Sequence, residues 1–234
     1  MLAIIKKELK AYLTSPIGYV ILAALLFFSG FNYYSVFATG VADMTYVFVG
    51  TITVVFFVIP ILTMRSFSEE KKQKTDQLLL TAPINNSSIV MGKFISSVLF
   101  FNIYIDVMIV YNLLFYFFGA SPDLVLFLGN IIGIELFSIS LISIGIFISS
   151  LTESQVVAAV GSFAVSFVLL MIDSISAMFN NSIVTAICNW ISFSDRYSHF
   201  TEGIFNIADF VFFISITAVF LFLTARIIDR KRWA

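Results

Sequence analysis

A dense group of charged side chains lies between Arg65 and Asp76, in a sequence that is otherwise poor in charge. The group consists of Arg65, Glu69, Glu70, Lys71, Lys72, Lys74 and Asp76. Only 12% of the 234 residues are charged, whereas 60% are hydrophobic. The glutamates precede the lysines, which is the order that the helix dipole favours. Ser66 stands three residues before Glu69, the spacing of a capping box at a helix start. The pattern predicts a short polar helix whose charges can pair with those of another protein.

An apolar part follows the charged part of the same segment. Leu78, Leu79 and Leu80 form a leucine triplet, and Pro83 ends the segment because the residue before a proline disfavours the helical conformation. We interpret residues 65–82 as one helix, and two interpretations of its function stay open. A solvated linker would carry the positive residues that orient a membrane protein, but it leaves the glutamates and leucines unexplained. A docking surface would use all of them.

The residue types that usually build catalytic or metal sites are scarce. The sequence has one cysteine, Cys188, and one histidine, His199, so we expect neither a cysteine metal site nor a Ser-His relay. The segment Met91-Gly92-Lys93-Phe94 lacks the upstream glycine and the hydroxyl of a phosphate loop. We therefore expect no enzyme activity and no cofactor in this chain. The net charge of −1 gives no indication of nucleic-acid binding.

Two acidic residues lie in the middle of apolar segments. They are Asp106 and Glu135, and Asn102 stands one helical turn before Asp106. Ionisable side chains inside a membrane usually face the bundle interior or a water-filled cavity. The two acids are thus candidates for a protonatable or substrate-contacting pair on a translocation route. The alternative is a protonated acid hydrogen-bonded between helices, and polar contacts of that kind are common in membrane bundles.

The elements that carry these residues are predicted to cross a membrane. The mean hydropathy is +1.02, and a spanning helix needs about 20 mostly apolar residues. Six segments meet this requirement: Ile17–Tyr34, Val47–Met64, Phe94–Phe118, Leu124–Ser150, Val156–Ile172 and Phe210–Ile228. The sequence therefore predicts an all-α membrane protein with six transmembrane helices, formed as a single domain over residues 1–234.

The distribution of basic residues predicts the orientation of these helices. With six spans, all lysines and arginines except Arg196 fall on the side that holds both termini. Basic residues in short loops favour the cytoplasmic side. We therefore expect both termini in the cytoplasm, with the chain in a bacterial cytoplasmic (inner) membrane.

Two flanking segments complete the predicted architecture. Residues 1–15 place Leu2, Ile5, Leu9 and Tyr12 at helical spacing, which predicts an amphipathic helix on the membrane surface, and Pro16 ends this helix or opens the first span. Residues 173–209 form a long extracytoplasmic connection that mixes apolar and polar residues. Because a structureless loop of that length is unusual, we expect short helices in it that dip back toward the bilayer.

Gly129 and Gly133 are four residues apart on the predicted fourth span. Small residues at this spacing allow another helix to approach closely. We expect a close helix contact here.

Four blocks of this sequence resemble the permease subunits of ABC type-2 transporters. The blocks are "ILTMRSFSEEKKQKTDQLLLTAPI" followed by "IVMGKF", then "KKELKAYLTSPIGYV", "IGIFISSLTESQVVAAVGSF" and "FTEGIFNIADFVFFISITAVFLFLTARIIDRKRW". Together they cover nearly the whole chain in the order of the family. The sequence is most similar to permeases of the gliding-motility and nitrous-oxide-accessory kind.

The resemblance implies a division of labour between subunits. Two such permeases, identical or homologous, would form the membrane core, and two ATP-binding subunits would bind ATP and Mg and dock on the cytoplasmic face. A periplasmic or membrane-anchored accessory protein is a further partner to expect. The helix between spans two and three would be the coupling helix, seated in a cleft of the ATPase. The docking set that carries over is Glu69, Glu70, Lys71, Lys72, Thr75, Asp76 and Leu78. Lys74 stands where the family often has glycine.

Three functions are compatible with the sequence at this point. The first, implied by the resemblance, is the permease half of an ATP-driven exporter. The second is a non-transporting anchor or mechanotransmitter that passes ATPase motion to a periplasmic partner. The third is an ion-coupled secondary transporter that uses Asp106 and Glu135, against which stands the lack of inverted repeats. The substrate is not indicated by any residue pattern.

Overall fold

The computed structural model describes residues 1–40, 43–75, 85–118, 122–178 and 182–233, and all regular structure in these ranges is α-helical. The helices are α1 (Leu2–Thr14), α2 (Pro16–Thr39), α3 (Thr45–Thr63), α4 (Arg65–Lys72), α6 (Asn86–Phe117), α7 (Leu124–Leu151), α8 (Gln155–Met178), α9 (Ser182–Ile191), α10 (Phe193–Thr201) and α11 (Ile207–Trp233). The predicted all-α class is confirmed.

Within the described ranges, six helices are long and apolar enough to cross a membrane, namely α2, α3, α6, α7, α8 and α11. This confirms the six predicted spans. The largest difference in bounds lies at the start of α6, which begins at Asn86 instead of Phe94. The extra turns contain two buried polar side chains, Asn86 and Lys93, and Asn86 donates to Asp229 on α11 at 2.7 Å.

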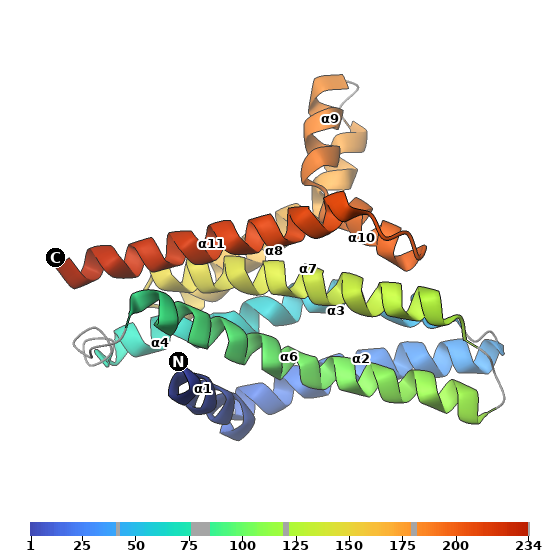
Figure 1. Cartoon of the computed structure of the whole chain (residues 1–234), viewed down its shortest axis with the longest axis horizontal. Coiled ribbons are helices and arrows are strands. Elements are labelled where there is room, and N and C mark those ends of the chain that lie inside the picture. Colours follow the sequence, from blue (N-terminus) through green and yellow to red (C-terminus); the bar gives the residue numbers. More distant parts are fainter. Residues whose placement is uncertain (41–42, 76–84, 119–121, 179–181, 234) are drawn as a thin grey trace.

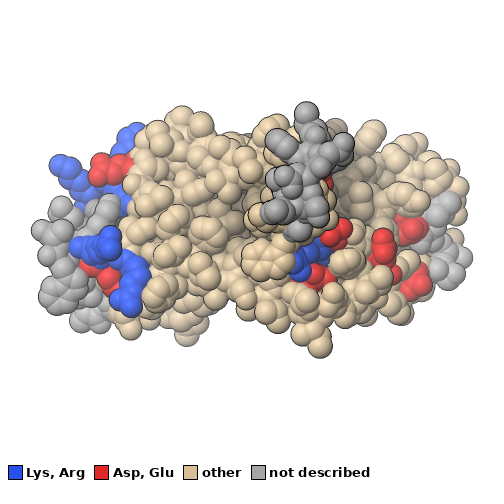
Figure 2. Space-filling model, turned by 90° about the horizontal axis from the view of Figure 1, so that it is seen from above, with Lys and Arg blue, Asp and Glu red and all other residues tan. Residues whose placement is uncertain are grey.

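The spanning helices run side by side along the long axis of the molecule, and both termini lie toward the same end (Figure 1). That end also holds α1 and α4 (Figure 1). Lys and Arg side chains gather on it, and a broad uncharged surface separates them from the other charged residues (Figure 2). We call this end the basic end. Helix α9 stands away from the bundle in the half that is farther from the basic end (Figure 1).

The core of the bundle is formed mainly by α3 and α7. In the most apolar stretch of α7, 61% of the residues are buried, against 17% in α8. The rings of Phe56 on α3 and Phe137 on α7 meet edge to face with centroids 4.8 Å apart. Phe137 also contacts Phe193 on α10, with centroids 5.7 Å apart. Helix α7 therefore links the core to the short helices at the far end.

Helix α4 continues almost directly from α3. Met64, the residue between them, keeps right-handed helical angles, and no side chain caps the start of α4. The predicted capping box at Ser66 is therefore wrong, because the helix has no free start there. The Ser66 side chain is buried and lies within 3.3 Å of the Tyr12 hydroxyl.

Helix α1 ends at Thr14, and Pro16 is the first residue of α2. Ser15 between them is extended, and its hydroxyl accepts a hydrogen bond from the Ile17 amide at 3.3 Å. This agrees with the role predicted for Pro16. The predicted apolar face of α1 is divided, since Tyr12 is buried within the protein whereas Leu2 is 75% exposed.

The long connection of residues 173–209 contains the short helices that its composition predicts. Helix α8 runs through Asp173 to Met178, and α9 and α10 follow. Helix α10 packs where Gly129 and Gly133 lie on α7: a Cβ at Gly133 would stand 2.7 Å from the Cβ of Phe200. The predicted close helix approach is confirmed, with α10 as the helix that approaches.

Candidate functional site at the basic end

Helix α4 is held on the end of α7 by polar contacts along its inner face. The Ser149 hydroxyl accepts hydrogen bonds from the amides of Phe67 and Ser68 at 3.1 and 3.2 Å, and it donates to the Met64 carbonyl at 3.0 Å. The buried ammonium of Lys71 donates to the Ser150 carbonyl. The first turn of α4 thus finds its hydrogen-bond partners in another helix instead of in a capping side chain.

A second set of contacts joins α4 to α1 and α6 through charged groups. Lys93 of α6 is only 2% exposed, and its ammonium lies 2.9 Å from Glu8 on α1 and 2.9 Å from Glu70 on α4. The same ammonium donates to the Ser66 carbonyl at 2.6 Å. Lys7, which is 63% exposed, adds an ion pair to Glu70 at 3.1 Å. Three segments that are far apart in sequence therefore meet at one buried cation.

Tyr12 forms a neutral polar contact beside this cluster. Its hydroxyl lies 3.1 Å from the Ser97 hydroxyl on α6 and donates to the Leu62 carbonyl on α3 at 3.3 Å. The guanidinium of Arg65 stacks over the Tyr12 ring, 4.7 Å from its centroid, and donates to the Ser15 hydroxyl at 2.7 Å. Arg65 therefore ties the start of α4 to the junction of α1 and α2.

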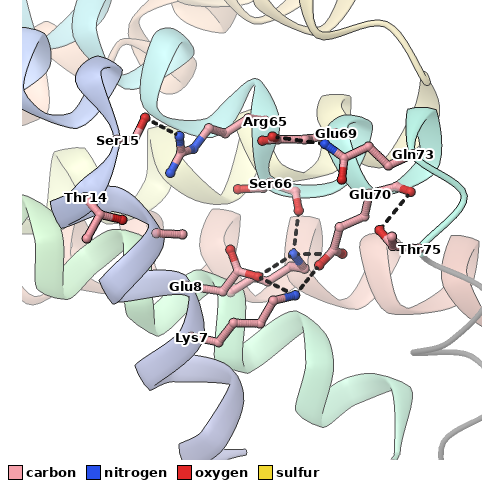
Figure 3. Close-up of a pocket in the computed structure, with 12 residues that line it drawn as sticks. Lys7, Glu8, Thr14, Ser15, Arg65, Ser66, Glu69, Glu70, Gln73 and Thr75 are labelled. Carbon is pink, nitrogen blue, oxygen red and sulfur yellow. Dashed lines mark hydrogen bonds and ion pairs between the residues drawn. The ribbon is translucent and has the colours of Figure 1, made fainter.

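A cavity of about 700 Å³ lies between α1 and α4, with the charged cluster in its wall. Glu8 from α1 and Glu70 from α4 point toward one another in it, and Arg65 extends toward Ser15 (Figure 3). Acidic and basic side chains both line the cavity. Lys7, Glu8, Glu70 and Lys93 form ion pairs with one another, Arg65 donates to the Ser15 hydroxyl, and Glu69 accepts a hydrogen bond from the Gln73 amide. The arrangement is suited to joining helices.

The structure divides the predicted docking set into inward and outward residues. Glu70 and Lys71 point inward and make the contacts described above. Glu69 is half-buried, and Lys72 and Thr75 are exposed. Asp76 and Leu78 lie outside the described residues. The role of the whole set in docking stays a prediction.

The intramembrane candidates are brought together only in part. The Asn102 amide of α6 donates to Glu135 on α7 at 3.1 Å and to the Val98 carbonyl at 2.9 Å. Asp106 is exposed on the surface of α6, with no hydrogen bond or ion pair to another described residue. The contact of Asn102 with Glu135 favours a structural link between α6 and α7.

A charged cluster at the end opposite the basic end escaped the sequence analysis. Asp209 at the start of α11 is 2% exposed, and its two oxygens lie 2.7 Å from Arg196 and 2.8 Å from His199, both on α10. Arg196 also donates to the Trp190 carbonyl at 3.0 Å. The signal was present, because Arg196 is the one basic residue predicted away from the basic end and His199 is the one histidine.

Among the described residues, no group of three or more His, Cys, Asp and Glu side chains could hold a metal ion. Cys188 is a free thiol on α9. The charged clusters join helices to one another in both places.

Comparison with protein families assigns this arrangement to a known class. Residues 2–234 match the family described as ABC-2 family transporter protein. No curated protein matches the chain. The family match covers all six spanning helices together with α1 and α4. The chain therefore belongs to the ABC-2 family of transporter proteins and is a multi-pass membrane permease subunit of an ABC transporter.

Proposed function

We propose that the chain forms one half of the membrane core of an ATP-driven exporter and that the ATPase subunit docks on α4. The family implies an ATP-binding partner. The observation that supports this docking site is that α4 is held by polar contacts to the neighbouring helices. Contacts to α1, α6 and α7 fix its inner face, while Lys72, its last residue, is exposed at the basic end. If a partner displaces a helix held in this way, the displacement is transmitted to the three helices that contact it.

The docking contact in this proposal has two layers. Glu69, Lys72, Thr75, Asp76 and Leu78 would meet the ATPase, whereas Glu70 and Lys71 would hold the helix in place. Exposed charge pairs add little affinity but fix register and partner choice. The proposed leucine contact at Leu78 would supply apolar area.

The membrane orientation follows from the same proposal. The basic end would face the cytoplasm of a bacterium, with the chain in the inner membrane, because Lys and Arg gather there (Figure 2). Two ATPase subunits would bind ATP and Mg, and a second permease, identical or homologous, would complete the core. This chain would be a non-catalytic subunit, and an accessory protein would bind at the opposite end.

Co-purification of the ATPase with the tagged permease tests the docking site. The test variant is the double charge reversal Glu69→Lys with Lys72→Glu, which leaves the inward residues Glu70 and Lys71 unchanged. The matched control is Arg230→Glu, which reverses an exposed charge at the same end of the molecule. We expect the ATPase to be lost from the double variant and kept by the control. If the double variant retains the ATPase as well as the wild type does, α4 is not the docking site.

A further inference from the structure

Lys93 has an unusual position for a lysine. It belongs to a membrane-spanning helix, and its side chain is only 2% exposed. Burial of a charge is costly unless the charge is paired and hydrogen-bonded. A lysine that only served membrane orientation would extend its ammonium into water instead. The cost therefore indicates a specific task for Lys93.

The three protons of the ammonium match three acceptors from two other segments. Glu8 on α1 accepts one at 2.9 Å, the Ser66 carbonyl on α4 accepts one at 2.6 Å, and Glu70 on α4 lies at 2.9 Å. An ammonium has three donors and no acceptor, so this site satisfies it completely. Arg196 makes a comparable link in the other half of the molecule, where it donates from α10 to Asp209 on α11 and to the Trp190 carbonyl on α9.

Uncharged residues next to Lys93 also bring the same three helices into close contact. The neighbouring Gly92 faces α1, where an added Cβ would lie 2.9 Å from Cγ2 of Ile4. The Phe67 ring of α4 lies under the Lys93 ammonium, 5.1 Å from it to the centroid. The backbone of α6 can approach α1 this closely because residue 92 has no side chain.

We propose that Lys93 is a positioning residue that latches α1 and α4 to α6, so that these elements move as one unit when the ATPase displaces α4. The common motion of these elements rests on the proposed function, whereas the latch itself does not. Lys72 at the end of α4 and Lys74 just after it are exposed and make no such contact. The amphipathic helix at the N-terminus then has a mechanical role, since motion of α4 reaches the membrane surface through it.

Hydrogen exchange of the purified permease tests the latch. Lys93→Met leaves two carboxylates facing each other, which by itself destabilises the chain, so the deciding variant is Lys93→Met with Glu8→Gln and Glu70→Gln. We expect roughly tenfold faster exchange or more in residues 2–14, because local opening sets the exchange rate, with exchange in α7 unchanged. Lys72→Met is the matched control and should resemble the wild type. Unchanged exchange in residues 2–14 of the triple variant would overturn the latch, as would an equal rise in α7.

A second measurement separates transmission from mere structural support. In the complex with its ATPase, a non-hydrolysable ATP analogue is expected to change exchange in both α1 and α4 of the wild type. In the triple variant the change should persist in α4 and disappear from α1. An equal response of α1 in both proteins contradicts the proposal. If no ATPase binds the wild type, the docking proposal fails, and the exchange of the isolated permease still decides the latch.

Discussion

Asp209 joins two helices at the end of the molecule opposite the basic end. One carboxylate oxygen contacts Arg196 and the other contacts His199, and the side chain is 2% exposed. Arg196 extends this link to α9 through the Trp190 carbonyl. A buried carboxylate with two cationic or hydrogen-bonding partners fixes the short helices relative to the last span. Removal of one partner from such a group is expected to cost more than the contact itself contributes.

Asp209→Asn is expected to destabilise the far end of the bundle. The change leaves the half-buried Arg196 without its carboxylate and removes a buried charge partner, which should lower the free energy of unfolding by about 3–5 kcal/mol. Thermal unfolding in detergent measures this effect, and limited proteolysis should show earlier cleavage in residues 192–206. The matched control is Asp195→Asn, an exposed position on α10 next to Arg196. An unchanged melting temperature for Asp209→Asn would contradict the role of the cluster.

Asn102 and Asp106 are expected to differ in their effect on stability. Asn102→Leu removes the donor to the half-buried Glu135, and the loss of this donor should lower the free energy of unfolding by about 1–3 kcal/mol. Asp106 is exposed and has no hydrogen bond or ion pair to another described residue. Asp106→Asn should therefore change the free energy of unfolding by no more than about 0.5 kcal/mol. Thermal unfolding of both variants checks the comparison. Equal losses would show that the Asn102–Glu135 contact contributes nothing to stability.

At the scale of elements, the short helix α10 depends on close contact with α7. Phe200 fits against Gly129 and Gly133, where larger residues would meet it. Phe200 is fully buried and also contacts Phe210 on α11, with centroids 5.2 Å apart. Helix α10 is thereby held against two spanning helices, α7 and α11.

Gly133→Ala is expected to displace α10. The new Cβ would lie 2.7 Å from the Cβ of Phe200, and overpacking of this kind costs about 1–3 kcal/mol. In the control Gly161→Ala, the nearest atom is a methyl group of Ile148 at 3.1 Å, which can shift more easily. Thermal unfolding of the two alanine variants measures the difference. If Gly133→Ala is as stable as Gly161→Ala, the close packing of α10 on α7 is wrong.

The spanning helices could be predicted because each is a long apolar run, and the presence of short helices in residues 173–209 followed from the mixed composition of that segment. The charged segment was harder to interpret. Its residues Glu70 and Lys71 are turned inward by partners on helices far away in sequence, Lys93 and the Ser150 carbonyl. Because these partners are far apart in sequence, their pairing produces no periodic pattern of residues. The buried position of Lys93 was missed for the same reason, although a charge within an apolar helix was itself a signal.

At the scale of the whole molecule, the two ends differ in charge and in the elements they hold. The basic end carries α1, α4 and the ends of the chain, and the other half carries α9 and α10 (Figure 1). A membrane protein with this asymmetry is expected to insert in one orientation. The single cysteine of the chain, Cys188 on α9, lies in the far half and offers a natural probe.

Labelling with a membrane-impermeant maleimide should distinguish the two ends. In intact spheroplasts, we expect Cys188 to react from outside. A Lys72→Cys variant in a Cys188→Ser background should react only after the membrane is opened. Labelling of position 72 in intact spheroplasts would show that the proposed orientation is reversed.

The central claim is that the ATPase touches the outward face of α4, and site-specific photo-cross-linking in the membrane tests it most directly. A photoreactive residue at position 72 is expected to cross-link to the ATPase subunit. The same residue at position 230, elsewhere at the basic end, and at position 117, an exposed site at the end of α6, should give no such product. The account would be contradicted by an ATPase adduct from position 117, or by its absence from position 72 in a complex that contains the ATPase.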